Sequence, residues 1–139
     1  MQSALRPNDV CGRYGGEEFV VMLPGATIEA AFVIAERIRN GFASLPIAFG
    51  DDRLWSSVSA GVASATSAAM SLDAIMKVAD DCLYSAKALG RNRVERPAKL
   101  PETSPAAIVR IAWAALTGSP GSWPAWSAMI RSASRARPS

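Results

Sequence analysis

The feature that most constrains the fold is a pair of glycines, Gly15 and Gly16, between two runs of strand-forming residues. The run behind the pair, residues 19–23, is apolar and rich in β-branched and aromatic side chains, which is typical of a buried strand. Glycine tolerates the positive φ that a tight hairpin turn requires, and Pro24-Gly25 closes the run. The sequence therefore predicts two short strands within residues 9–23, joined at the glycine pair.

The rest of residues 1–96 predicts two helices and more strands. We expect a helix over residues 27–40, a second hairpin over 45–63, a second helix over 71–89 and a closing strand over 93–95. Thr27 and Ser71 are the expected N-caps, and Gly41 and Gly90 are the expected stops. The second helix carries a periodic apolar stripe, expected to be buried, made of Leu72, Ile75, Met76, Ala79, Leu83 and Ala86.

The composition changes after Arg96 to a stretch rich in Pro, Ser, Ala and Trp. We therefore expect a domain over residues 1–96 and a flexible tail over 97–139, in which residues 106–117 could form one marginal helix. Residues 1–96 carry 10 basic and 11 acidic residues, and residues 97–139 carry 5 and 1. The basic excess thus belongs to the tail, and we expect no nucleic-acid partner.

Several classes of site and location are excluded or disfavoured by what the sequence contains. The chain has no histidine and only two cysteines, which excludes zinc motifs and histidine-dependent catalysis. No signal-peptide pattern is visible, and no apolar run approaches the ~20 residues of a membrane helix. We expect a cytoplasmic domain with reduced thiols and no membrane span.

Two adjacent carboxylates, Glu17 and Glu18, follow the glycines. At a hairpin turn the strand alternation is broken, so the two side chains can converge, which requires a compensating cation. Mg²⁺ is the usual partner, bound by one or two carboxylates and by phosphate oxygens. A solvated hairpin tip is the alternative, and the spacing alone does not decide between them.

Four motifs together resemble the C-terminal part of the GGDEF domain, the catalytic domain of diguanylate cyclases. They are R-Y-G-G-E-E-F at residues 13–19, A-E-R-I-R at 35–39, S-V-S-A-G-V-A at 57–63 and A-D-D-C-L-Y-S-A-K-A-L-G-R-N-R-V at 79–94. The resemblance implies an α+β fold: an antiparallel sheet with packed helices, of the ferredoxin-like or polymerase-palm type of nucleotide cyclases.

The resemblance also implies a reaction. Two GTP molecules, one on each domain of a homodimer, are joined into cyclic di-GMP with Mg²⁺ or Mn²⁺. Gly15 and Gly16 would lie beside the GTP, and Glu17 would be a metal ligand. Glu18 would be the second carboxylate, acting on the metal or helping to activate the attacking hydroxyl.

Basic residues are assigned two roles by the same resemblance. Lys87 and Arg91 match residues that reach the GTP phosphates, and we expect their i, i+4 spacing to place both on one side of the helix end. Two solvated cations at a helix C-terminus are the alternative. Arg6 and Asp9 match an R-x-x-D inhibitory site that binds cyclic di-GMP, and Arg37 matches a second arginine of that site.

The family pattern begins with a strand and two helices that have no counterpart before Arg6. That block carries a further metal-binding aspartate and the residues that recognise guanine. The missing strand is central in the family's sheet, so we expect the isolated chain to be unstable or self-associating. The sequence thus predicts a diguanylate cyclase domain that is inactive as this truncated chain. The alternative is a catalytically dead module that binds cyclic di-GMP, and in either case upstream domains could attach the full protein to a membrane.

Overall fold

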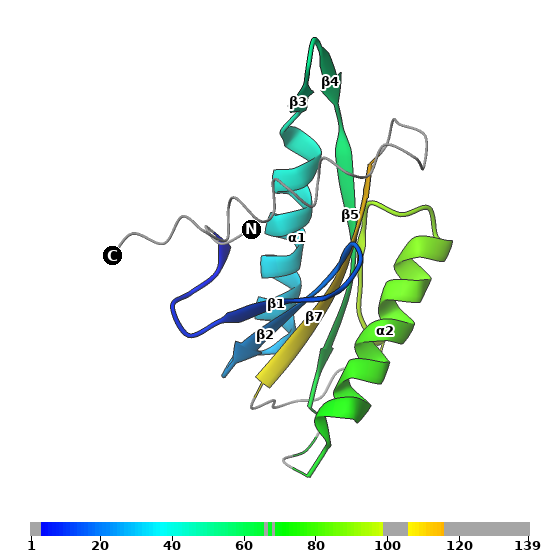
Figure 1. Cartoon of the computed structure of the whole chain (residues 1–139). Coiled ribbons are helices and arrows are strands. Elements are labelled where there is room, and N and C mark those ends of the chain that lie inside the picture. The colour runs from blue at the N-terminus through cyan, green and yellow to red at the C-terminus, as the bar shows by residue number, and fades with distance from the viewer. Residues whose placement is uncertain (1–3, 66, 68, 99–105, 116–139) are drawn as a thin grey trace.

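The computed structural model describes residues 4–65, 67, 69–98 and 106–115, and these form two helices and a set of short strands (Figure 1). In chain order the elements are β1 (Val10–Gly15), β2 (Glu18–Pro24), α1 (Ile28–Ser44), β3 (Ile47–Phe49), β4 (Asp52–Leu54), β5 (Ser56–Ser64), α2 (Leu72–Ala88), β6 (Val94–Glu95) and β7 (Ala106–Ala115). The α+β class is therefore confirmed. The predicted first hairpin and closing strand are present as well.

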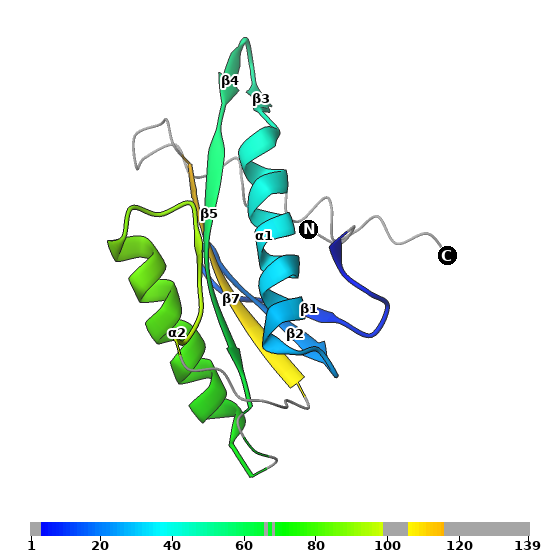
Figure 2. The ribbon, with the colours of Figure 1, turned by 180° about the vertical axis from the view of Figure 1, so that it is seen from behind.

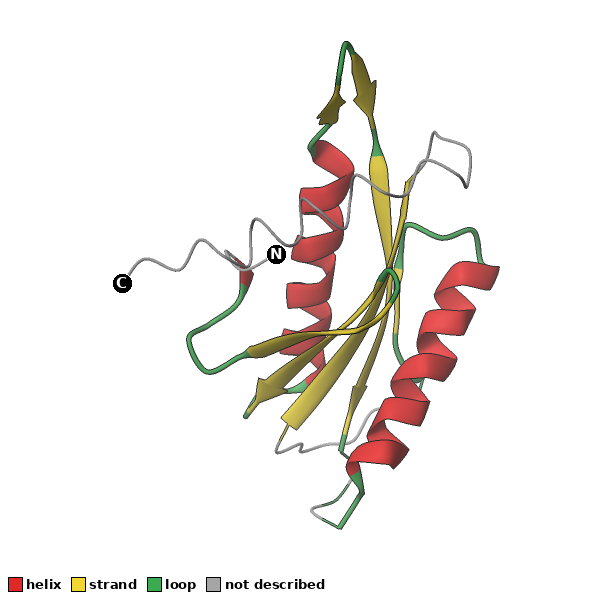
Figure 3. Ribbon diagram, viewed as in Figure 1, coloured by secondary structure: helices red, strands yellow, loops and turns green. Residues whose placement is uncertain are grey.

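The main sheet has five strands in the order β1-β2-β7-β5-β6. All of its pairs are antiparallel except that between β5 and β6, so the sheet is mixed and the expected purely antiparallel sheet is wrong in this detail. Strands β3 and β4 form a separate hairpin, which Figure 3 shows at the end of α1, beyond the main sheet.

The central strand, β7, comes from the segment expected to be a marginal helix, and that prediction is wrong. The strand β7 runs antiparallel to both of its neighbours, β2 and β5. Its Val109 is the Cα partner of Val21 in β2 and of Val62 in β5. Between two strands its backbone groups find partners on each side, which an isolated helix of this length cannot match in stability.

The expectation of a gap at the centre of the sheet is also corrected. The structure places β7 at this position, between β2 and β5, so the sheet has no open centre that would make the chain unstable or self-associating. The division of the chain at residue 96 stays a prediction. The structure adds only that residues 106–115 of the second part pair with strands of the first.

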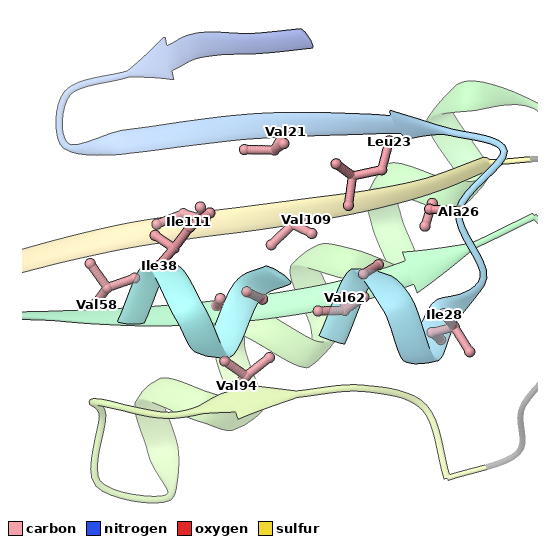
Figure 4. Close-up of a cluster of buried hydrophobic side chains, with 14 residues drawn as sticks. Val21, Leu23, Ala26, Ile28, Ile38, Val58, Val62, Val94, Val109 and Ile111 are labelled. Atoms are coloured by element: carbon pink, nitrogen blue, oxygen red, sulfur yellow. The ribbon is translucent and has the colours of Figure 1, made fainter. Parts of the chain in front are cut away.

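The helices cover opposite faces of the sheet (Figure 2). On one face, α1 packs over the larger core cluster, in which Val21, Val62 and Val109 lie side by side across three strands (Figure 4). On the other face, α2 packs over a smaller cluster that includes Ala63 and Ile108. Because β5 is covered on both faces, all nine of its residues are buried.

Both predicted N-caps are confirmed. The Oγ1 of Thr27 accepts from the Ala30 N–H at 3.2 Å, and the Oγ of Ser71 accepts from the Ala74 N–H at the same distance. The predicted stop at Gly41 is wrong, because α1 continues to Ser44. Its C-cap residue, Leu45, is extended, as expected for the residue before a proline.

The predicted apolar stripe of α2 is largely confirmed. Its buried residues are Ile75, Ala79, Leu83 and Ala86. Leu72 is instead 54% exposed, because it is the first residue of the helix and lines an open groove beside the first hairpin. Past the helix end, Gly90 has a φ of 112°, which confirms it as the stop.

Gly61 in β5 is where α2 comes closest to the sheet. A Cβ added to Gly61 would clash with the Ala79 carbonyl oxygen and with the Leu83 nitrogen. Both are backbone atoms of α2, which cannot rotate away as a side chain can. The absence of a side chain at residue 61 therefore sets the distance between α2 and the sheet.

We predict that Gly61→Ala lowers the free energy of unfolding by about 3 kcal/mol, because α2 must move away from the sheet. Gly12→Ala is the matched control, since a Cβ there meets no atom within 4 Å. It should change stability by less than about 1 kcal/mol. Urea denaturation followed by circular dichroism measures both values, and equal effects of the two substitutions would contradict this packing.

Candidate functional site

The turn of the first hairpin is made by Gly16 and Glu17, since Gly15 is the register partner of Glu18. Gly16 has a φ of 47°, whereas Gly15 is not in the positive-φ region, so only one of the two glycines serves the turn by its conformation. The Nε of Arg13 donates to the Gly16 carbonyl at 2.9 Å. A Cβ built on either glycine meets no atom within 4 Å, so this backbone is open to a ligand.

The two carboxylates of the motif have different surroundings. Glu17 lies in the turn and is exposed. Glu18 is the first residue of β2 and is bound at both oxygens. The Nζ of Lys87 lies 3.3 Å from its Oε1, and the Nη2 of Arg110 donates to its Oε2 at 2.9 Å. Within the described residues, the cations that face this carboxylate are Lys87 and Arg110.

Arg110 is the residue of this site that sequence reasoning missed. It lies on β7, and its side chain is only 4% exposed. Its Nε is 2.7 Å from Oδ1 of Asp80 on α2, an ion contact without hydrogen-bond geometry. Its guanidinium carbon stands 3.9 Å from the centre of the Tyr14 ring. The signal in the sequence was a lone arginine in the apolar run of residues 106–112.

The two basic residues assigned to the phosphates lie in different places. Lys87 is in the last turn of α2 and contacts Glu18, as described above. Arg91 follows the end of the helix with a φ of 61°, and its N–H donates to the Ala86 carbonyl. Because α2 ends at Ala88, the i, i+4 geometry expected for the pair is absent. A phosphate-binding role for Arg91 stays a prediction.

The R-x-x-D residues form a small cluster of their own before β1. The backbone N–H of Arg6 donates to Oδ2 of Asp9 at 2.7 Å, and the Arg6 Nη2 donates to Oδ1 at 3.1 Å. The Asp9 side chain is fully buried, whereas that of Arg6 is 55% exposed. Both residues line a pocket together with Leu5, Pro7, Val10 and Cys11. Partial desolvation raises the pKa of the Cys11 thiol, which is therefore neutral in this pocket.

Arg37 is exposed on α1. Within the described part of the chain, no hydrogen bond or ion pair joins it to Arg6 or Asp9. Its place in a product site stays a prediction.

The residues present do not fit a divalent ion in this conformation. Among residues 4–65, 67, 69–98 and 106–115, no group of three acidic, histidine or cysteine side chains could hold a metal. Both oxygens of Glu18 already face cations, and β7 brings an arginine to the site.

The part of the chain that the structure describes contains no helix with the length and hydropathy of a membrane span.

Comparisons with known proteins agree on one family. Residues 1–93 match the family described as "Diguanylate cyclase, GGDEF domain". The chain is 39% identical over 94 residues to Diguanylate cyclase A of Treponema denticola, covering 68% of this chain and 25% of that protein. It is 41% identical over 96 residues to Response regulator PleD of Caulobacter vibrioides, covering 68% and 21%. The chain thus spans about a quarter or less of these relatives.

We predict that Glu18→Gln lowers the free energy of unfolding by about 2 kcal/mol, because the substitution leaves the buried guanidinium of Arg110 short of negative charge. Glu17→Gln is the matched control, because it makes the same chemical change on an exposed side chain. It should change the free energy of unfolding by less than about 0.5 kcal/mol. Denaturation of the two variants side by side measures the difference. A larger loss for Glu17→Gln would show that the pairing described for Glu18 is wrong.

Proposed function

Because the chain belongs to the GGDEF family of diguanylate cyclase domains, we propose that its first hairpin and the end of α2 form the GTP-binding part of a diguanylate cyclase site. Cyclases of this family act on GTP and use a divalent metal. In the longer protein, two such domains would meet as a homodimer and join two GTP molecules into cyclic di-GMP, each domain presenting half of the reaction centre.

The observation that carries the proposal is the contact between Lys87 and Glu18. The two residues are 69 positions apart in the chain and belong to two separate motifs of the resemblance, yet Nζ lies 3.3 Å from Oε1. Family membership alone does not require an intact site. The convergence of these two motifs in space supports a preserved one.

The local chemistry suits a polyphosphate. Lys87 is 36% exposed, so its ammonium can leave Glu18 and bind a phosphate oxygen as a compact point charge. Gly15 and Gly16 offer backbone without side chains beside it, so phosphate groups can come close. Arg91, exposed just past the helix end, adds positive charge at the same end of α2.

In the described conformation we propose that this site binds nucleotide without turnover. Glu18, expected to act on the metal or on the attacking hydroxyl, has both oxygens engaged by Lys87 and Arg110. Glu17 is the exposed carboxylate of the pair, and it is the one that we assign to the Mg²⁺ or Mn²⁺ of the active, longer protein. Turnover would further require a guanine-selecting segment and a second domain.

We predict that Lys87→Ala weakens binding of a fluorescent GTP analogue about tenfold, the loss of one charge-assisted contact to phosphate. Lys77→Ala is the matched control, because Lys77 lies on the same helix and pairs with Asp81 at the surface. It should leave the affinity within about twofold. Fluorescence titration of the full 139-residue chain measures both, and equal affinities of the two variants would contradict a GTP site at this end of α2.

A second candidate function is a module that binds cyclic di-GMP without catalysis. The observation that favours it is the accessible guanidinium of Arg6 beside the pocket that it lines with Asp9. A planar, exposed guanidinium can bind a phosphate in a bidentate way and stack on a base. To serve a guanine edge, the Asp9 carboxylate would have to release part of its contact with Arg6.

For this candidate we predict that Arg6→Ala reduces cyclic di-GMP affinity more than tenfold in isothermal titration calorimetry. Arg53→Ala changes an exposed arginine of β4 and should leave affinity unchanged. No binding by the unaltered chain would eliminate the candidate, and it would leave the GTP proposal untouched because the residues are different.

A further inference from the structure

We infer that Arg110 supplies from within the chain the positive charge that a divalent cation would otherwise supply at the hairpin carboxylate, so that the site in this conformation is charge-compensated without metal. The inference rests on the ion pairs of the described residues and does not depend on whether the chain binds GTP.

The guanidinium lies between carboxylates of two different elements. Its Nη2 is 2.9 Å from Oε2 of Glu18 on β2, and its Nε is 2.7 Å from Oδ1 of Asp80 on α2. One cation bridging two carboxylates is the arrangement that a hard metal ion commonly makes. Here the guanidinium of an arginine side chain takes that position.

The position of Arg110 is set by the backbone around it. In the sheet register, its Cα partners are Val20 on β2 and Gly61 on β5. Gly61 is where α2 comes closest to the sheet, against the Ala79 carbonyl, and Asp80 is the next residue of that helix. The close approach at Gly61 thus brings the Asp80 carboxylate over the sheet beside the arginine.

The remaining surroundings of Arg110 are also those of a fixed internal cation. Its side chain is 4% exposed, and the Tyr14 ring lies over the guanidinium at 3.9 Å. Removing such a charge from water is costly unless it is paired, and the two carboxylates and the ring offset part of that cost. Within the described residues, Nε and Nη1 of Arg110 have no hydrogen-bond partner. An arginine placed at the surface by chance would not be enclosed in this way.

This arrangement disfavours a third cation at Glu18, which already faces Lys87 and Arg110. A divalent ion on either oxygen of Glu18 would stand within a few ångströms of Arg110 or Lys87, and like charges at that distance repel strongly in a partly buried site. Metal can therefore bind Glu18 only after these pairs break. As long as β7 keeps its place, the site is closed to metal at this carboxylate.

The test is divalent-ion binding by the 139-residue chain, with Arg110→Asp and Arg110→Asn as a matched pair that differs in one carboxylate. Arg110→Asp places a third carboxylate beside those of Glu18 and Asp80, where the unaltered chain has the guanidinium. We expect millimolar Mn²⁺ or Mg²⁺ to raise the melting temperature of Arg110→Asp by about 5 °C or more. The same ions should raise the melting temperature of Arg110→Asn by a smaller amount, because only Glu18 and Asp80 then face the ion. They should leave the unaltered chain unchanged.

A second measurement keeps the inference open to contradiction if Arg110→Asp does not fold. Electron paramagnetic resonance of Mn²⁺ titrated into the unaltered chain and into Glu18→Gln should give the same bound fraction, because the side chain of residue 18 holds no metal in either protein. Mn²⁺ binding by the unaltered chain that falls in Glu18→Gln would overturn the inference. So would a metal-induced rise in the melting temperature of the unaltered chain as large as that of Arg110→Asp.

Discussion

The pairing of β7 with β2 on one side and β5 on the other is the interaction on which the rest of the structure depends. Without it the hairpin of β1 and β2 would have no hydrogen-bonded connection to β5 and β6 in the described residues. Two antiparallel ladders meet on this one strand, and its side chains enter both cores: Val109 and Ile111 face α1, while Ile108 lies under α2. A strand that satisfies backbone groups on both edges and buries both faces stabilises the whole sheet.

The same strand determines the chemistry of the site. Because β-strand side chains alternate, placing Val109 and Ile111 in the core under α1 places Arg110 on the opposite face, under α2. That is also the face on which Glu18 and Lys87 meet. A shift of β7 by one residue would bury the arginine in the apolar core, which its charge forbids, so the ion pairs and the register of the strand reinforce one another.

Local signals in the sequence were sufficient for the elements that local interactions determine. Thr27 and Ser71 are caps whose hydroxyls accept from N–H groups three residues away, and the first hairpin needs only Gly16 at its turn. The strand β7 could not be predicted in this way, because an alanine-rich apolar run suits a helix or a strand equally. The segment forms a strand because it pairs with the edges of β2 and β5, which are distant in sequence. Since β7 was not predicted, the place of Arg110 in the site was not predicted either.

The most direct test of this account is a set of nuclear Overhauser measurements on the uniformly labelled 139-residue chain. If β7 is central, backbone protons of Val109 will show cross-strand contacts to both Val21 and Val62, and its amide will be protected from exchange with solvent. If Val109 shows neither contact and its amide exchanges rapidly, β7 is not part of the sheet. The position of Arg110 beside Glu18 would then have no structural basis.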